Sequence, residues 1–292
     1  MTSKMTENIK NILRSGLYIV ATPIGNLGDI TFRAVETLNS VDLIACEDTR
    51  TSLKLLNRYD IKKPLTAYHK FNETKAGEKL IEELKNGKHI AVITDAGTPV
   101  ISDPGNVLTK LLVSEGLEYT VIPGATAFVP ALILSGLDSS RFAFIGFLPD
   151  KKKDREELLN RYKNLDMTMI FYSAPHDLIN DLETLYSVFG ARKAAVCKEI
   201  TKLHEGAEHI VLGEKLSEEE PKGEYVIVVE GGEAEQNSLL SLPIEKHILY
   251  YMESGLDKKD AVKAVAKDRK MTKSDVYKFS IDLEKIFQAK KQ

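Results

Sequence analysis

Short apolar runs alternate with helical patterns through the first half of the chain. The runs predict strands at residues 17–21, 41–46, 65–69, 89–94 and 119–122. The clearest helix between them spans residues 74–86, where Leu80, Ile81 and Leu84 share one face and Gly87 follows as a C-terminal stop. Short apolar strands that alternate with helices are typical of a mostly parallel sheet covered by helices on both faces.

The second half repeats this alternation but ends differently. We expect strands at residues 142–147, 168–172, 193–198, 209–212 and 224–230, and helices at residues 154–162 and 176–189. The last strands pair without an intervening helix, which indicates a mixed sheet. A polar stretch at residues 138–140 predicts a hinge or linker between the two halves.

Beyond a polar linker at residues 231–238 the chain becomes helical. An apolar stripe predicts one helix after Pro243, and residues 258–267 and 274–286 predict two more. Residues 241–292 hold twelve Lys and Arg against eight acids. Three short basic helices favour a small helix-turn-helix-like module. A helical tail packed on the core or on a partner subunit is the alternative.

Bulk properties limit the class of protein. The 292 residues are 43% hydrophobic and 28% charged, with a net charge of -3, as in a globular protein. We expect a cytoplasmic protein without a membrane span, because the N-terminus is polar and no apolar run is long enough. Cys46 and Cys197 lie in apolar strands, which predicts buried thiols. Residues 151–163 are locally basic, with six Lys and Arg against three acids.

Four loops that follow strands in the first half differ in composition from the rest. They are rich in Gly, Pro and acidic residues and lie at residues 21–31, 47–50, 95–105 and 122–127. In a parallel sheet all four emerge at the carboxyl edge, so we expect them to converge on one crevice. An ordinary strand-to-helix turn explains one such loop, but packing alone does not explain four.

The same loops exclude several kinds of site. None reads Gly-x-Gly-x-x-Gly or Gly-x-x-x-x-Gly-Lys-Ser/Thr, so neither a conventional dinucleotide site nor a P-loop is supported. No His/Cys cluster has metal-ligand spacing and no nucleophile elbow is present, so we expect no metal. Asp95 and Asp103 offer acceptors for a ribose hydroxyl or an ammonium group.

Five collinear segments resemble the tetrapyrrole methylase family, in its branch that modifies ribosomal RNA. They read ATPIGNLGDIT at residues 21–31, EDTR at 47–50, TDAGTPVISDPG at 94–105, IPGATA at 122–127 and FYSAPHD at 171–177. The resemblance covers roughly residues 16–232 and extends to the C-terminal helices. It implies two α/β domains with S-adenosylmethionine in the cleft between them, and a homodimer. It also implies methylation of a cytidine 2′-hydroxyl in the decoding region of small-subunit rRNA.

The resemblance also implies which residues bind the cofactor. Residues 95–97 replace the Gly-Asp-Pro loop of the family with Asp-Ala-Gly, a departure that fits the rRNA branch. The implied cofactor residues are Pro23, Asp95, Ala96, Gly97, Val100, Ile101, Ser102, Pro123, Gly124, Ala125, Thr126, Tyr172, Ser173, Ala174, Gly223 and Glu224.

For the methyl transfer itself, the ribose hydroxyl needs a proton acceptor. Glu47 and Asp48 are the candidate bases, and Arg50 either orients them or holds an RNA phosphate. A structural ion-pair network of the same three residues is the alternative. Basic and aromatic groups for RNA are expected at residues 68–71 and at Lys151, Lys152, Lys153 and Arg155.

We therefore expect a tail at residues 1–14, α/β domains at 15–137 and 138–235, and an RNA-binding module at 241–292. Two other functions stay open. One is a methyltransferase for a small tetrapyrrole-type molecule, which the basic C-terminal helices do not fit. The other is a DNA-binding regulator that senses S-adenosylmethionine, in which residues 47–50 have no obvious purpose.

Overall fold

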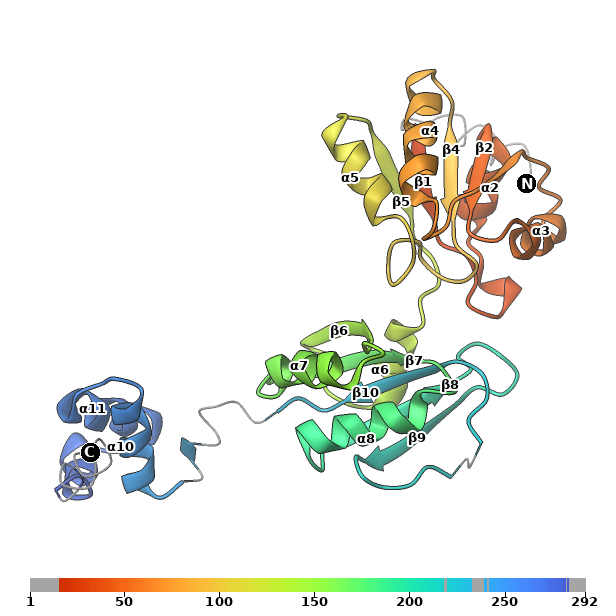
Figure 1. Cartoon of the computed structure of the whole chain (residues 1–292). Helices are drawn as coiled ribbons and strands as arrows, with labels where there is room; N and C mark the ends of the chain where they lie inside the picture. Colours follow the sequence, from red (N-terminus) through yellow and green to blue (C-terminus); the bar gives the residue numbers. More distant parts are fainter. Residues whose placement is uncertain (1–15, 218–219, 233–238, 241, 282, 284–292) are drawn as a thin grey trace. The chain divides into compact units, whose positions relative to one another are not determined.

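The structure is a computed structural model that describes residues 16–217, 220–232, 239–240, 242–281 and 283 (Figure 1). The described residues form two compact units, one within residues 1–150 and 168–230 and the other within 151–167 and 231–292. These units do not follow the expected domain boundaries, which stay a prediction. The expected tail at residues 1–14 and most of the linker lie outside the described residues.

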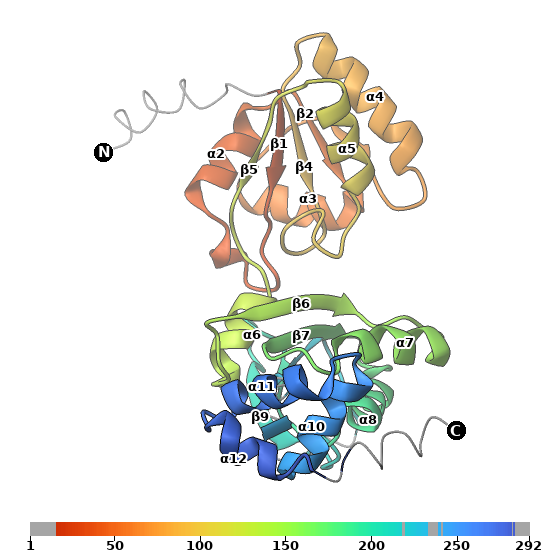
Figure 2. The ribbon, with the colours of Figure 1, turned by 90° about the vertical axis from the view of Figure 1, so that its left-hand side faces the viewer.

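The first unit begins with a five-stranded sheet in which every pair of neighbours is parallel. In spatial order its strands are β3 (Leu65–Ala67), β2 (Leu43–Cys46), β4 (Ile90–Ile93), β1 (Leu17–Val20) and β5 (Tyr119–Ile122). Helices α2 (Phe32–Ser40) and α3 (Thr49–Arg58) pack on one face, and α4 (Glu73–Lys85) and α5 (Asn106–Ser114) on the other (Figure 2). The predicted parallel sheet with two covered faces is confirmed.

A second five-stranded sheet completes this unit. In spatial order its strands are β6 (Phe142–Phe147), β7 (Thr168–Ser173), β10 (Tyr225–Val229), β8 (Lys193–Lys198) and β9 (Gly206–Val211). Only β6 and β7 pair in parallel, so the predicted mixed sheet is confirmed. Helix α6 (Phe128–Ser135) packs against Ile170 and Val228, whereas Phe171 faces Phe189 of α8 (Leu178–Phe189).

The second unit is helical among its described residues. It contains α7 (Lys152–Tyr162), α10 (Ile244–Glu253), α11 (Lys258–Asp268) and α12 (Lys273–Lys278). Ile248, Val265 and Val276 are buried in one apolar cluster. Asp257 and Thr272 cap α11 and α12 with their side chains, as their positions before a helical pattern predict. The helix predicted at residues 274–286 is interrupted, since α12 ends at Lys278 and a turn follows at residues 279–281, while residues 282 and 284–286 lie outside the described part.

The burial of the two cysteines and the length of the helices bear on two expectations from the sequence. Cys46 and Cys197 are both free and fully buried, and burial raises the pKa of each thiol, so the prediction of inert core thiols is confirmed. None of the helices in the described residues is both long and apolar enough to span a membrane.

Candidate functional site

Loops from the carboxyl ends of the first sheet meet as predicted. Thr22 after β1 and Gly97 after β4 exchange backbone hydrogen bonds of 2.8 and 3.1 Å. The hydroxyl of Thr98 donates to the carbonyl oxygen of Ala125, which follows β5, at 3.2 Å. The loops are therefore joined into one surface at this edge of the sheet.

A cavity of about 450 Å³ opens at this edge. The first sheet and its loops contribute Ile24, Glu47, residues 94–98, residues 101–103, Thr126 and Ala127. The second sheet and its loops contribute Phe147, residues 172–175, Ile200 and residues 224–226. Small-molecule pockets typically enclose about 300–1,000 Å³, so the cavity is large enough for a nucleoside-sized ligand.

Many of the residues expected to bind the cofactor line this cavity. They are Asp95, Ala96, Gly97, Ile101, Ser102, Thr126, Tyr172, Ser173, Ala174 and Glu224. The others are not among its lining residues: Pro23, Val100, Pro123, Gly124, Ala125 and Gly223.

Two of these other residues have clear packing roles. A Cβ atom on Gly124 would lie 2.9 Å from the Cβ of Ala21, so this glycine permits close packing of the β1 and β5 ends. Val100 packs on the core formed with α4 and α5, and its φ of 77° is unusual for a β-branched residue. The turn at Val100 leads into Ile101 and Ser102, which line the cavity.

Three carboxylates gather around Thr94 at the end of β4. The hydroxyl of Thr94 donates to Glu47 at 3.1 Å, and Glu47, Asp95 and Asp103 all line the cavity. Burial raises the pKa of Asp103 to about 6, and the neighbouring charges of Glu47 and Asp95 add to this effect. Asp103 is therefore poised to exchange a proton near neutral pH.

Asp48 and Arg50 lie beside the cavity but do not line it. Asp48 caps α3 by accepting the backbone N–H of Arg50 at 2.8 Å, and it accepts both Nε and Nη2 of the same guanidinium, at 3.2 and 2.8 Å. These bonds lower the pKa of Asp48 to about 2. The backbone N–H of Asp48 donates to Asp95 at 3.2 Å, which ties the cap to the acidic cluster.

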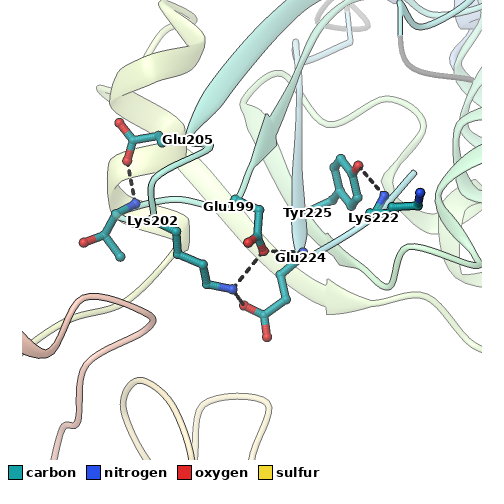
Figure 3. Close-up of polar contacts among 7 residues, drawn as sticks. Glu199, Lys202, Glu205, Lys222, Glu224 and Tyr225 are labelled. Carbon is teal, nitrogen blue, oxygen red and sulfur yellow. Dashed lines mark hydrogen bonds and ion pairs between the residues drawn. The ribbon is translucent and has the colours of Figure 1, made fainter. Parts of the chain in front are cut away.

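An ion-pair cluster supports the opposite wall (Figure 3). Lys202 donates to Glu199 at 2.8 Å and to Glu224 at 3.0 Å, and its ion pairs raise the pKa of Lys202 although burial opposes them. A Cβ on Gly223, whose φ is +91°, would lie 2.5 Å from the Glu199 carboxyl carbon. Gly223 does not line the cavity, but its lack of a side chain leaves room for the Glu199 carboxylate that binds Lys202.

Aromatic residues form the apolar part of the second wall. The ring of Tyr172 lies edge-on to Phe144 and Phe147, with centroids 4.9 and 5.4 Å away. Burial raises the pKa of the Tyr172 hydroxyl. The hydroxyl of the next residue, Ser173, donates to buried Asp181 at 2.7 Å.

Several lining residues are not among those that the family resemblance implies for the cofactor, although the sequence offers Asp103 as an acceptor for a ligand. They are Ile24, Thr94, Thr98, Asp103, Ala127, Phe147, Pro175, Ile200, Tyr225 and Val226. Phe147 ends a predicted strand, and Ile200 follows one by two residues. Phe147 and Ile200 lie at or just beyond the end of a strand, where ligand-binding residues are expected in such sheets. Apolar residues at these positions are equally typical of a core, so the sequence does not distinguish the two roles.

The expected basic patch for RNA is only partly exposed. Lys151, Lys152 and Lys153 are exposed, and the last two lie 3.9 and 4.0 Å from Glu156 and Glu157. Arg155, in contrast, is only 3% exposed, so the expectation that it binds RNA is wrong. Arg155 lies on the buried side of α7, and the largely polar sequence of this helix does not show which side is buried.

Comparison with known proteins identifies the relatives of this fold. The sequence profile of the family "Tetrapyrrole (Corrin/Porphyrin) Methylases" matches residues 16–216. The chain is 44% identical over 268 residues to "Ribosomal RNA small subunit methyltransferase I" of Halalkalibacterium halodurans, a match that covers 89% of this chain and 93% of that protein. The protein of the same name from Bacillus subtilis is 42% identical over 269 residues, with 89% and 92% covered.

Solved structures agree on the fold alone. The methyltransferase CobJ aligns with a TM-score of 0.57 at 19% identity, covering 74% of this chain and 94% of that chain. Diphthine synthase aligns with a TM-score of 0.58 at 14% identity, covering 74% and 89%.

Proposed function

The chain belongs to the tetrapyrrole methylase family, and we propose that it transfers a methyl group from S-adenosylmethionine to rRNA of the small ribosomal subunit. The acceptor is the 2′-hydroxyl of a cytidine in the decoding region. The observation that carries the proposal is the identity of 42–44% to rRNA methyltransferases over 89% of the chain. The solved structures support the architecture and say nothing about the substrate.

The cavity fits this cofactor in size and chemistry. Its volume of about 450 Å³ and its mixed polar and apolar lining match a nucleoside joined to an amino acid. The hydroxyl of Thr126 is buried and has no hydrogen-bond partner among the described residues, so it is available to a polar ligand atom. Gly97, with a φ of 85°, lets the loop turn beside Ala96, and a Cβ there would lie 3.3 Å from Ile24, another lining residue. When bound, S-adenosylmethionine supplies an activated methyl group on a sulfonium.

The chain contributes positioning, exclusion of water and a proton acceptor. Asp103 is the best-placed base, because its pKa of about 6 makes it both deprotonated and basic at neutral pH. Burial raises that pKa most, and the charge of Glu47 raises it further. Asp48 is a poor base, since its pKa is about 2 and its carboxylate is held by Arg50. Arg50, whose side chain is 87% exposed, remains available to an RNA phosphate.

The basic parts of the second unit contribute to RNA binding. Lys151, Lys152 and Lys153 are exposed before and within α7, and α10 to α12 carry further lysines on their outer faces. Exposed cations of this kind contact phosphates and make affinity depend on salt. The intact small subunit is the expected partner, and we therefore expect the protein to act in the cytoplasm.

The active form is a homodimer. Strand β5 lies at an edge of the first sheet, and its Val121 is 46% exposed. Val113 of α5 and Ile133 of α6, the neighbours of β5 in the chain, are 68% and 71% exposed. An apolar edge of this kind needs a partner to cover it. A Val121→Glu variant that stays monomeric in light scattering while the wild type is a dimer supports this arrangement, and a monomeric wild type contradicts it.

The substrate class is tested by offering three acceptors to the same enzyme. Purified protein and methyl-labelled S-adenosylmethionine are incubated with small ribosomal subunits, tetrapyrrole precursors or duplex DNA. We expect label on the rRNA alone. Label on the tetrapyrrole identifies a small-molecule methyltransferase. Binding to duplex DNA without any label transfer identifies a regulator.

A further inference from the structure

One segment of the first unit is strongly basic although the chain as a whole is acidic. Between Thr49 and Asn72 there are six Lys and Arg and a single acid, whereas the net charge of the whole chain is -3. The basic residues are Arg50, Lys54, Arg58, Lys62, Lys63 and Lys70, and the acid is Asp60. This segment comprises α3, β3 and the loop that leads to α4.

Helix α3 presents a basic stripe to solvent. Arg50, Lys54 and Arg58 follow one another at intervals of four residues and are exposed, while Leu55 and Leu56 are buried on the other side. Successive cations along such a stripe lie about 6 Å apart. No ion pair joins Lys54 or Arg58 to any described residue, and Arg50 is 87% exposed in spite of its bond to Asp48. The stripe starts where β2 ends, directly after Glu47 of the cavity.

An exposed aromatic ring lies in the loop after β3, the strand that pairs with β2. Phe71 is 94% exposed, and its ring lies edge-to-face with the His69 ring, with centroids 6.1 Å apart. The loop that carries it is fixed, since His69 N–H donates to the Asn72 side chain at 2.8 Å and Asn72 N–H returns a bond to His69 at 2.9 Å. Tyr68 N–H donates to Cys46 at 2.8 Å, which anchors the loop to the end of β2.

We propose that α3 and the β3–α4 loop form a binding surface for the single-stranded rRNA next to the target nucleotide. Lys54 and Arg58 contact consecutive phosphates, and Phe71 stacks on an unpaired base. This proposal rests on the proposed rRNA substrate. Single-stranded RNA is bound in this way, by cations along its backbone and aromatic faces against its bases.

The chemistry of the surface favours RNA over a protein partner. Five excess positive charges suit a polyanion, and a lone aromatic ring on a fixed loop offers too little apolar area for a stable protein interface. A ring that is 94% exposed adds little to folding, so its contribution is available to a ligand. The location beside Glu47 brings the bound strand to the mouth of the cavity.

The phosphate contacts are tested with two matched double variants. Lys54→Ala with Arg58→Ala removes two exposed cations four residues apart from α3. Lys75→Ala with Lys79→Ala removes two at the same spacing from α4, where both are also exposed. Binding to deproteinised small-subunit rRNA is measured between 50 and 200 mM salt. The α3 variant should lower the slope of log affinity against log salt by about 1.4 and weaken binding roughly tenfold or more. The α4 variant should leave both unchanged.

The aromatic contact is tested with Phe71→Ala and Phe71→Trp. The alanine variant should weaken binding about tenfold without changing Tm, and tryptophan should restore it, because stacking needs a π face rather than one particular ring. Equal effects of the α3 and α4 variants, or wild-type affinity in Phe71→Ala, overturn the proposal.

A cofactor control separates this proposal from the proposed function. All variants should bind S-adenosylmethionine like the wild type, because none of the altered residues lines the cavity. If the wild type methylates rRNA but the α3 and Phe71 variants bind it normally, the proposed binding surface is wrong and the proposed function is retained. If the wild type methylates no RNA, the proposed function itself fails.

Discussion

At the scale of the residue, the chemistry of the site centres on Asp103. Its carboxyl lies in the cavity beside Glu47, and burial raises its pKa to about 6. A base must be deprotonated, so methyl transfer should fall about tenfold per pH unit below pH 6. Asp103→Asn should lower kcat by about 10²–10⁴ while leaving the Kd for S-adenosylmethionine within a few fold.

The pH profile of Glu47→Gln is the check on this assignment. Removing the neighbouring negative charge should lower the pKa of Asp103, so the acid limb of the kcat/KM profile should move to lower pH. An acid limb that stays in place, or an active Asp103→Asn enzyme, shows that another group accepts the proton.

Asp48 gives a second prediction at this scale, because its two roles can be separated. Asn caps helices about as well as Asp, but it carries no charge to hold Arg50. Asp48→Ala should lower Tm, whereas Asp48→Asn should retain Tm and alter methylation through Arg50 alone. Tm and the initial rate of methylation are measured for both variants. Unchanged methylation in both would show that neither Asp48 nor its ion pair with Arg50 takes part in the mechanism.

Single residues were predictable from sequence when a loop motif placed them. Asp95, Gly97 and Thr126 follow strand ends in Gly-rich and Pro-rich segments, and all three line the cavity. Gly124 is expected at the cofactor, but it does not line the cavity, and its lack of a side chain permits close packing on Ala21. A glycine that serves a ligand and one that serves packing have the same pattern, and only the contact distances separate them.

At the scale of the element, the C-terminal helices depend on a buried polar network. His247 is fully buried in α10, accepts Nε of Arg269 at 3.2 Å and lies 3.4 Å from Asp268. The hydroxyl of Tyr251 donates to Asp268 at 2.6 Å. Burial, followed by the charge of Arg269, lowers the pKa of His247, so the imidazole is neutral in the fold.

This arrangement predicts that acid loosens the helical unit. A His whose pKa is lower in the folded state contributes stability that is complete above its unfolded value of about 6.5 and is lost as the pH falls. Between pH 7.5 and 5, amides of α10 and α11 should lose more hydrogen-exchange protection than those of β1 and β4, after correction for the intrinsic rate. His247→Gln does not titrate and should remove this difference. Equal losses in wild type and variant contradict the role of His247.

The ends of elements were harder to predict than their existence. Helix α6 begins only at Phe128, because Thr126 and Ala127 of the preceding loop line the cavity. Strand β9 begins at Gly206, before the expected residue 209, since its first residues are exposed or half-buried and form no apolar run. Local pattern predicts the apolar centre of an element, while tertiary contacts decide where it stops.

At the scale of the whole molecule, the cavity needs both sheets of the first unit. The loop ends of the first sheet were expected to converge, since parallel strands share an edge. Ile200 and Phe147 of the second sheet were not assigned to the site, because no local pattern states which apolar residue faces a ligand. The ion pairs of Lys202 with Glu199 and Glu224 are equally a product of the tertiary fold.

Removal of residues 241–292 tests the division of labour between the two units. The truncated protein should bind small ribosomal subunits at least about tenfold more weakly, because it loses twelve basic residues, several of which are exposed on α10 to α12. Its Kd for S-adenosylmethionine should change little, since every lining residue of the cavity lies in the first unit. Equal affinity for subunits after truncation, measured by filter binding, rules out an RNA-binding role for these helices.

The central claim is methyl transfer to a ribose hydroxyl of small-subunit rRNA. It is tested most directly by incubating the enzyme with methyl-labelled S-adenosylmethionine and small subunits that lack the modification. The rRNA is then digested to nucleosides and the labelled product is identified by mass spectrometry. The account predicts label in 2′-O-methylcytidine with the wild type and none with Asp103→Asn. Label on a base, or no label in the rRNA, contradicts it.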